Sequence, residues 1–198
     1  MRGVCDIIAK PLGSRYNNSK SIGDNKSLIL NTEVFNHQYI NREAEVIEPP
    51  AVNPLNLSKG DIIILHHNVF RRWHDVKGRE KNSRSYFQED QYFVQSNQVF
   101  LTKTPNAEWR CAEGYCFVQP IKENDFFSDE AEKPLIGIVK HSDGTVPKGE
   151  LVGFTPGDEF EFIVDGQRMY RVMSKFITIK YEYQGDEEEY NPSWAYSS

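Results

Sequence analysis

The side chains of this sequence that could do chemistry are few and widely spaced. His66 and His67 are adjacent, and His74 follows them. Adjacent residues of a strand point to opposite faces, so these histidines favour no shared metal ion. Cys111 and Cys116 lie five residues apart without a second pair, which is not the spacing of a zinc site. No nucleophile elbow, phosphate-binding loop or zinc-protease motif occurs. We therefore expect no catalytic residue, no metal, no cofactor and no enzymatic activity.

Binding chemistry is better represented, because positive charge gathers between Val69 and Arg84. Cations beside an indole can dock an acidic protein surface, or bind nucleic acid through phosphate contacts and base stacking. A solvated loop would carry the same charges. The candidate partner-binding residues are Arg71, Arg72, Trp73, Lys77 and Arg79, with His74, Lys81 and Arg84 in the same run.

The segment 184–198 joins an acidic run, Asp186–Glu189, to an aromatic end. Free tails are usually polar, so Tyr190, Trp194 and Tyr196 indicate docking, either onto a partner or onto the chain's own fold. Trp194 is therefore a further candidate partner-binding residue.

The composition is that of a globular protein, with 38% hydrophobic and 26% charged residues. The net charge of −6 argues against nucleic acid as a general partner. Three cysteines, an odd number, favour reduced thiols. No secretory leader is recognisable, and the longest apolar run, Ile62–Leu65, is far too short for a membrane span. We expect a cytoplasmic protein with no membrane partner.

Short β-rich runs separated by Gly, Pro, Asn and Asp predict an all-β chain without sustained helical periodicity. Asp165-Gly166 predicts a hairpin turn after one of these runs. Many short strands at close spacing are typical of a sandwich or a small barrel. The predicted strands are Val4–Ala9, Ala44–Ile47, Asp61–Leu65, Tyr92–Val94, Gln98–Thr102, Tyr115–Gln119, Leu135–Val139, Glu159–Val164, Met169–Met173 and Phe176–Tyr183.

The order of these runs repeats once along the chain. Lys59-Gly60-Asp61 opens a strand, as Pro156-Gly157-Asp158 does. The run from Tyr92 to Thr102 aligns with the run from Tyr170 to Lys180. Two further pairs complete the repeat: Ile7–Leu12 with Phe117–Ile121, and Ala44–Ile47 with Ile136–Val139.

The repeat predicts two tandem small β-barrels, covering residues 1–104 and 115–183, followed by the tail 184–198. Two insertions, 11–42 and 69–90, lengthen the first copy only. Insertions in surface loops cost little free energy and are common places for function.

The segment order resembles that of the GroES-type co-chaperonins, in particular the double-length forms encoded by tailed bacteriophages. Asp6-Ile7-Ile8-Ala9-Lys10-Pro11 is similar to their first strand, and Leu28-Ile29-Leu30 is similar to the apolar triplet that ends their mobile loop. The second copy matches less well, because Lys122–Pro134 offers only Phe126-Phe127 in place of the triplet. The later strands of the family are matched by Ala44–Ile47, Leu57–Ile64 and Ser96–Val99.

This resemblance implies two tandem GroES-like barrels and a co-chaperonin function. The protein would form a homo-oligomer in the host cytoplasm, cap a GroEL-type chaperonin ring and assist the folding of phage proteins. Leu28, Ile29 and Leu30 would bind the chaperonin, presented by a polar segment, Gly13–Ser27, that orders on binding. The alternative is a structural protein of a virion or other assembly, with virion proteins as partners.

Overall fold

The computed structural model describes residues 2–16, 19–21, 27–29, 39–123, 132–193 and 195. These residues form β-strands joined by loops and short 3₁₀ turns, which confirms the predicted all-β class. The chain divides into two compact units, Met1–Trp109 and Arg110–Ser198, which are described separately. None of the described segments is a helix long and apolar enough to cross a bilayer.

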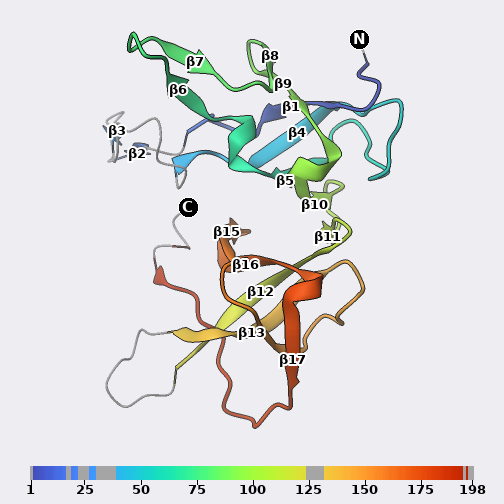
Figure 1. The fold of residues 1–198 in the computed structure, drawn as a ribbon, viewed down its shortest axis with the longest axis vertical. Helices are drawn as coiled ribbons and strands as arrows, with labels where there is room; N and C mark the ends of the chain where they lie inside the picture. The colour runs from blue at the N-terminus through green and yellow to red at the C-terminus, as the bar shows by residue number, and fades with distance from the viewer. Residues whose placement is uncertain are drawn as a thin grey trace. The chain divides into compact units, whose positions relative to one another are not determined.

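Unit 1 is built on an antiparallel sheet in which its strands have the order β10-β5-β4-β1-β9-β8 (Figure 1). The strands are β1 (Ile7–Pro11), β4 (Glu43–Glu48), β5 (Ile62–Leu65), β8 (Tyr86–Gln88), β9 (Gln91–Val94) and β10 (Val99–Lys103). Two hairpins stand outside this sheet: β2 (Ser19–Ser21) with β3 (Ser27–Ile29), and β6 (Arg72–His74) with β7 (Glu80–Asn82). The 3₁₀ turns are η2 (His67–Val69) and η3 (Ser96–Gln98).

Unit 2 begins with the short strand β11 (Arg110–Cys111) and is built on a sheet with the order β15-β16-β12-β13-β14-β17. Its turn η4 (Ser174–Phe176) lies between the last two strands in sequence, as η3 does in unit 1. The strands are β12 (Tyr115–Lys122), β13 (Glu132–Ser142), β14 (Leu151–Phe154), β15 (Phe160–Val164), β16 (Gln167–Met173) and β17 (Ile177–Tyr181).

The two sheets share one strand order and one register. Ala9 lies opposite Val46 and Tyr92 in unit 1, as Val118 lies opposite Val139 and Tyr170 in unit 2. Two register shifts also recur at equivalent places. The shift between β1 and β4 in unit 1 matches one between β12 and β13 in unit 2, and the shift between β5 and β10 matches one between β14 and β17. Bulges are specific features of a fold, so their recurrence supports a duplicated module.

Within the part of the chain that the structure describes, neither sheet closes on itself by hydrogen bonding. Among the described residues, no strand pairing joins β8 to β10 in unit 1 or β15 to β17 in unit 2. Side chains instead fill the interior of each unit from one face of its sheet, and the inward positions alternate along the strands. In unit 1 they include Ile7, Ala9, Val46, Ile63, Leu65 and Val94, and their counterparts in unit 2 are Cys116, Val118, Val139, Val152, Phe154 and Val172.

The structure corrects the repeat at one strand. The sequence comparison matched Gly60-Asp61 with Gly157-Asp158, but Gly157-Asp158 precedes β15, the counterpart of β8. Gly149 is the true counterpart of Gly60. The amide of Gly60 donates to the Val46 carbonyl and that of Gly149 to the Val139 carbonyl, both at 2.8 Å.

A second correction is a displacement by one residue in β13. Ala44 lies opposite Pro11, and Gly137 lies opposite Pro120, so Ala44 matches Gly137 rather than Ile136.

The turn predicted at Asp165-Gly166 is confirmed, since Val164 pairs with Gln167 across it and both turn residues have positive φ, 49° and 75°.

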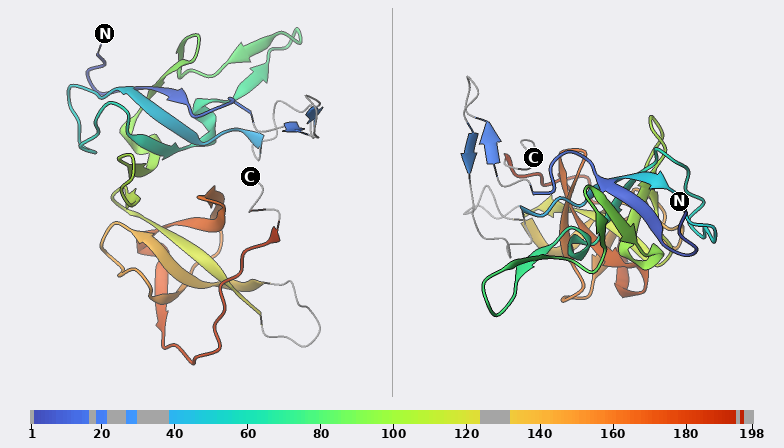
Figure 2. Two further views of the ribbon diagram at one scale, coloured as in Figure 1. Left: turned by 180° about the vertical axis from the view of Figure 1, so that it is seen from behind. Right: turned by 90° about the horizontal axis from the view of Figure 1, so that it is seen from above.

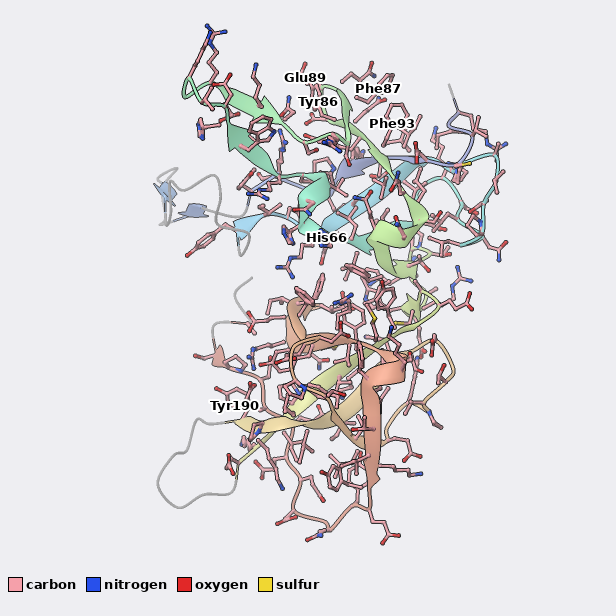
Figure 3. All side chains as sticks on the ribbon, viewed as in Figure 1. His66, Tyr86, Phe87, Glu89, Phe93 and Tyr190 are labelled. Carbon is pink, nitrogen blue, oxygen red and sulfur yellow. The ribbon has the colours of Figure 1, made fainter. Side chains whose placement is uncertain are left out.

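The β8–β9 hairpin of unit 1 carries two aromatic pairs, and Figure 3 labels three of their members, Tyr86, Phe87 and Phe93. The ring centroids of Tyr86 and Tyr92 are 5.7 Å apart, and those of Phe87 and Phe93 are 4.7 Å apart. Because successive side chains of a strand alternate in direction, each pair occupies its own face of the hairpin. These pairs hold the short edge strand β8 on β9.

Candidate binding site

The long connection between β1 and β4 is clamped to unit 1 at its base. The Leu12 amide donates to the Glu43 carbonyl at 2.9 Å, and the Asn41 amide donates to the Arg15 carbonyl at 3.1 Å. The Asn41 side chain is buried and donates to the carbonyls of Leu12 and Ser14 at 2.8 and 2.9 Å. It also accepts the Glu43 amide at 2.8 Å. Both ends of the connection therefore leave the sheet from one fixed point.

Arg15 ties this base to the second insertion. Its guanidinium donates to the carbonyl oxygens of Phe70 and Arg71 at 2.5 and 3.1 Å and to Asn82 Oδ1 at 2.7 Å. It also lies over the Tyr92 ring, 5.3 Å from the centroid. Burial lowers the pKa of Arg15 below its ordinary value and raises that of Tyr92. An arginine keeps its charge despite such a shift, so these hydrogen bonds have a charged donor at all physiological pH values.

Tyr16 makes a second link between the two insertions. Its backbone forms an antiparallel bridge with Ile40, and its hydroxyl accepts the Arg72 amide at 2.8 Å. The Arg72 guanidinium lies 5.0 Å from the centroid of the Tyr16 ring and pairs with Glu80 at 3.1 Å. The Arg72 side chain is therefore engaged inside unit 1, although the sequence marked it as a docking residue.

The backbone of the predicted chaperonin-binding residues lies on this connection, outside the main sheet. In the β2–β3 hairpin, Ser19 pairs with Ile29 and Lys20 pairs with Leu28. Leu30 lies outside the described residues, and so do the side chains of Leu28 and Ile29.

The predicted basic run forms an arm, defined as residues 71–84, on the β6–β7 hairpin. Figures 1 and 2 show this hairpin projecting from the sheet of unit 1. Trp73 pairs with Lys81 across it, is 45% exposed, and donates its indole N–H to the Asn82 carbonyl at 3.1 Å. Ser83 Oγ donates to the Val69 carbonyl at 2.5 Å, which closes the base of the arm.

Hydrogen bonds to Asp75 organise the tip of the arm. Its Oδ1 accepts the amides of Lys77 and Arg79, both at 2.9 Å. The Arg79 amide is the main reason that the pKa of Asp75 lies below its ordinary value. The side chains of Lys77 and Arg79 are exposed, as is that of Arg71 at the base. The structure thus gathers the predicted partner-binding residues on one arm, except Trp194, which lies outside the described residues.

His66 and His67 do not point to opposite faces of a strand, as the sequence analysis expected. His67 begins η2 rather than continuing the strand, and the rings of His66 and His67 stack with centroids 4.3 Å apart. His66, labelled in Figure 3, accepts the Asn68 amide on Nδ1 at 3.1 Å. Within the described ranges, no group of three or more His, Cys, Asp or Glu side chains is placed to hold a metal ion.

Unit 2 has a different arrangement where its β12–β13 connection meets the sheet. Arg168, whose side chain is 11% exposed, pairs with Glu132 and with Glu161, the latter at 2.7 Å. Tyr170 accepts from Arg168 and donates to Glu132, both at 2.5 Å. Burial would lower the pKa of Arg168, but the hydrogen bonds to the two carboxylates outweigh it and raise that pKa. Burial and the Glu132 contact likewise raise the pKa of Tyr170.

The backbone of the acidic run forms a strand-like addition to β12, while the side chains of Asp186, Glu188 and Glu189 are exposed. Glu189 bridges Ile121, the Lys122 amide donates to the Glu188 carbonyl at 2.8 Å, and the Tyr190 amide donates to the Pro120 carbonyl at 2.8 Å. Figure 3 labels Tyr190 on this segment. The interpretation that the tail docks onto its own fold is therefore correct for this part of it.

Sequence reasoning missed the residues that clamp the connection. Arg15, Tyr16, Asn41 and Asn82 are ordinary polar residues in polar segments, and Arg15 contacts Phe70 across 55 positions of sequence. No periodicity or motif marks such a contact. The one signal that could have indicated these clamp residues is the clustering of large polar side chains at both ends of the connection.

Replacing Arg15 with alanine is expected to lower the free energy of unfolding of unit 1 by about 2 kcal/mol, because three acceptors lose a charged donor. Hydrogen exchange should quicken at the arm base and at Asn41. Arg15→Lys should recover only part of the loss, since the lysine ammonium cannot reach three separate acceptors as the planar guanidinium does. Arg84→Ala, at an exposed position of the same unit, is the control and should cost less than about 0.5 kcal/mol. Equal effects of the two variants would contradict the role of Arg15.

No model of a known protein family matches the chain, and no curated protein sequence matches it. The function proposed below therefore depends on the residues and their geometry.

Proposed function

We propose that this protein is a co-chaperonin-like cap with two tandem GroES-like, barrel-like modules. The first module binds a GroEL-type chaperonin ring through the connection 12–42, and the protein assists the folding of phage proteins in the host cytoplasm. The observation that carries the proposal is the long polar connection with an apolar triplet, clamped at its base, on the first of two equivalent modules.

The chemistry of the connection suits reversible capture by a groove. Gly, Ser, Asn, Lys and Asp dominate residues 13–27, so the sequence of the segment offers few apolar side chains for packing. Leu28-Ile29-Leu30 supplies an apolar anchor. Ordering the segment on binding weakens each contact, and several copies acting together restore the overall affinity.

The clamp supports the same role. Asn41 and Arg15 fix where the connection leaves unit 1, so a contact at its tip can transmit force to the module. In unit 2 the equivalent place is occupied by the Glu132, Arg168 and Tyr170 cluster and by the tail strand. This difference supports chaperonin binding by the first module rather than the second.

The test is native mass spectrometry of the protein with a purified GroEL-type chaperonin and nucleotide. The parent protein should form a complex, and the double variant Leu28→Asp/Ile29→Asp should lose it, because charge cannot enter an apolar groove. Phe126→Asp/Phe127→Asp, on the shorter connection of the second module, is the matched control and should bind like the parent.

Three outcomes would count against the proposal. Binding that survives the Leu28→Asp/Ile29→Asp change would show that these residues do not anchor the chaperonin. Loss of binding in the Phe126→Asp/Phe127→Asp control would show that the second module also takes part. Stoichiometric recovery of the chain from purified phage particles, without chaperonin binding, would favour a structural role instead.

A further inference from the structure

The arm on unit 1 differs in charge from the rest of the chain. It holds six Lys and Arg residues against Asp75 and Glu80, whereas the whole chain has a net charge of −6. Two of its cations are engaged locally, since Arg72 pairs with Glu80 at 3.1 Å and Lys81 lies 4.0 Å from Asp75. Lys77 and Arg79 at the tip form no ion pair within the described part of the chain. Their charge is therefore directed outward.

The arm also exposes two apolar side chains. Val76 is fully exposed, with a relative exposure of 104%, and Trp73 is 45% exposed on the same hairpin. The Asp75 carboxylate accepts two backbone amides of the turn and lies 4.0 Å from Lys81, so it is engaged within the hairpin and forms no ion pair with Lys77 or Arg79. An apolar residue between cations, on a projecting hairpin, has the composition of a docking element.

Unit 2 contains a cavity of about 410 Å³ with the complementary chemistry. Its floor is apolar and aromatic, formed by Leu151, which is buried, and by Ile136 and Tyr181, which are half-buried. Its rim is acidic, with one lysine, Lys133, among four carboxylates. The rim carboxylates are those of Glu123, Glu182, Asp186 and Glu187.

The geometry points to self-association in which the arm of one copy inserts its tip into this cavity of a second copy. Val76 would cover the floor beside Leu151 and Tyr181, and Lys77 and Arg79 would face the carboxylates of the rim. The volume is large enough to receive the Val76 side chain. The contact joins two different surfaces, so each copy can both give an arm and receive one. Such contacts build a ring when the rotation closes.

Charge complementarity favours a second copy over other occupants. An acidic, apolar-floored receptor of suitable size lies on the same chain, and an arm that binds it needs no other partner. Nucleic acid would also meet the cations, but it would leave Val76 uncovered and would be repelled by the remainder of the acidic chain. The inference does not depend on chaperonin binding, which uses the connection 12–42.

The test is sedimentation velocity of the full chain over a range of concentrations, at low and high salt, without chaperonin. The mass should rise with concentration and fall with salt. Lys77→Glu/Arg79→Glu should weaken association at least about tenfold, and so should Glu123→Lys/Glu182→Lys on the rim. Val76→Asp should weaken it as well. The matched control, Lys59→Glu/Lys175→Glu, changes the net charge equally at exposed sites elsewhere and should associate like the parent.

Mixing the two charge-reversed variants provides the sharpest readout, because each arm then meets a rim of opposite charge and association should return. A parent chain that stays monomeric at all concentrations overturns the inference. So does a rim variant that associates like the control. Binding of single-stranded DNA by the parent, lost in Lys77→Glu/Arg79→Glu while the mass is unchanged, would assign the arm to nucleic acid instead.

Discussion

Replacing Gly137 with alanine is expected to destabilise unit 2 by about 3 kcal/mol, because β13 has no room for a Cβ at this position. An added Cβ would lie 2.8 Å from Cγ1 of Val118 and closer still to the carbonyl oxygen of Gln119. Both residues belong to β12, which pairs with β13 and β16, so relief requires backbone movement in the middle of the sheet. Hydrogen exchange in increasing urea, resolved by peptide, measures the free energy of unfolding of each unit separately.

Ala44 provides the matched control, because it occupies the equivalent place opposite Pro11 in unit 1 and is fully buried there. Ala44→Gly should cost unit 1 about 1 kcal/mol through the flexibility of glycine in the unfolded chain, and should leave unit 2 unchanged. A Gly137→Ala protein as stable as the parent would contradict the close approach of β12 and β13.

Replacing Glu132 with alanine is expected to cost unit 2 about 2 kcal/mol. The side chain of Arg168 is 11% exposed and donates to Glu132, so the change leaves a largely buried cation with one carboxylate partner fewer. Tyr170 also loses the acceptor of its hydroxyl, which Glu132 provides at 2.5 Å. Because the pKa of Tyr170 is raised on folding, the stability from its protonated hydroxyl is present below about pH 10 and lost at higher pH.

Glu161 separates this effect from simple loss of negative charge. It pairs with the same guanidinium, but its side chain is 42% exposed, so Glu161→Ala should cost about 0.5 kcal/mol or less. Chemical denaturation followed by peptide-resolved exchange compares the two variants. Equal losses would show that burial does not distinguish the two ion pairs.

Strand positions could be predicted from the sequence wherever apolar residues alternated or ran together. Tyr92 and Tyr170, for example, were aligned correctly because both begin runs with a period of two. The strand β14 could not be found, because Gly153 interrupts Leu151–Phe154. Its backbone nonetheless pairs well, and an added Cβ would lie 3.0 Å from Cε2 of Tyr181, so the glycine accommodates a ring rather than a turn.

The candidate site was predictable only where its signals lie in consecutive residues. Charge composition marked Lys77 and Arg79, and an apolar triplet marked Leu28 and Ile29, because both signals lie in consecutive residues. The clamp depends on contacts such as that between Arg15 and Asn82, which only the folded sheet brings together. The adjacent histidines were placed wrongly, since the turn η2 begins within the pair and ends the strand alternation.

Because the tail pairs with β12, the two units are completed at different times during translation. Every strand of the unit 1 sheet has been translated once Lys103 leaves the ribosome, so that unit can fold while the rest is still being made. The last strand of the unit 2 sheet ends at Tyr181, but the end of β12 gains its second partner only when Tyr190 emerges and reaches Pro120. A nascent chain stalled before Glu188 would leave that edge of β12 open to neighbouring chains, which makes slow translation of the last segment a hazard for aggregation.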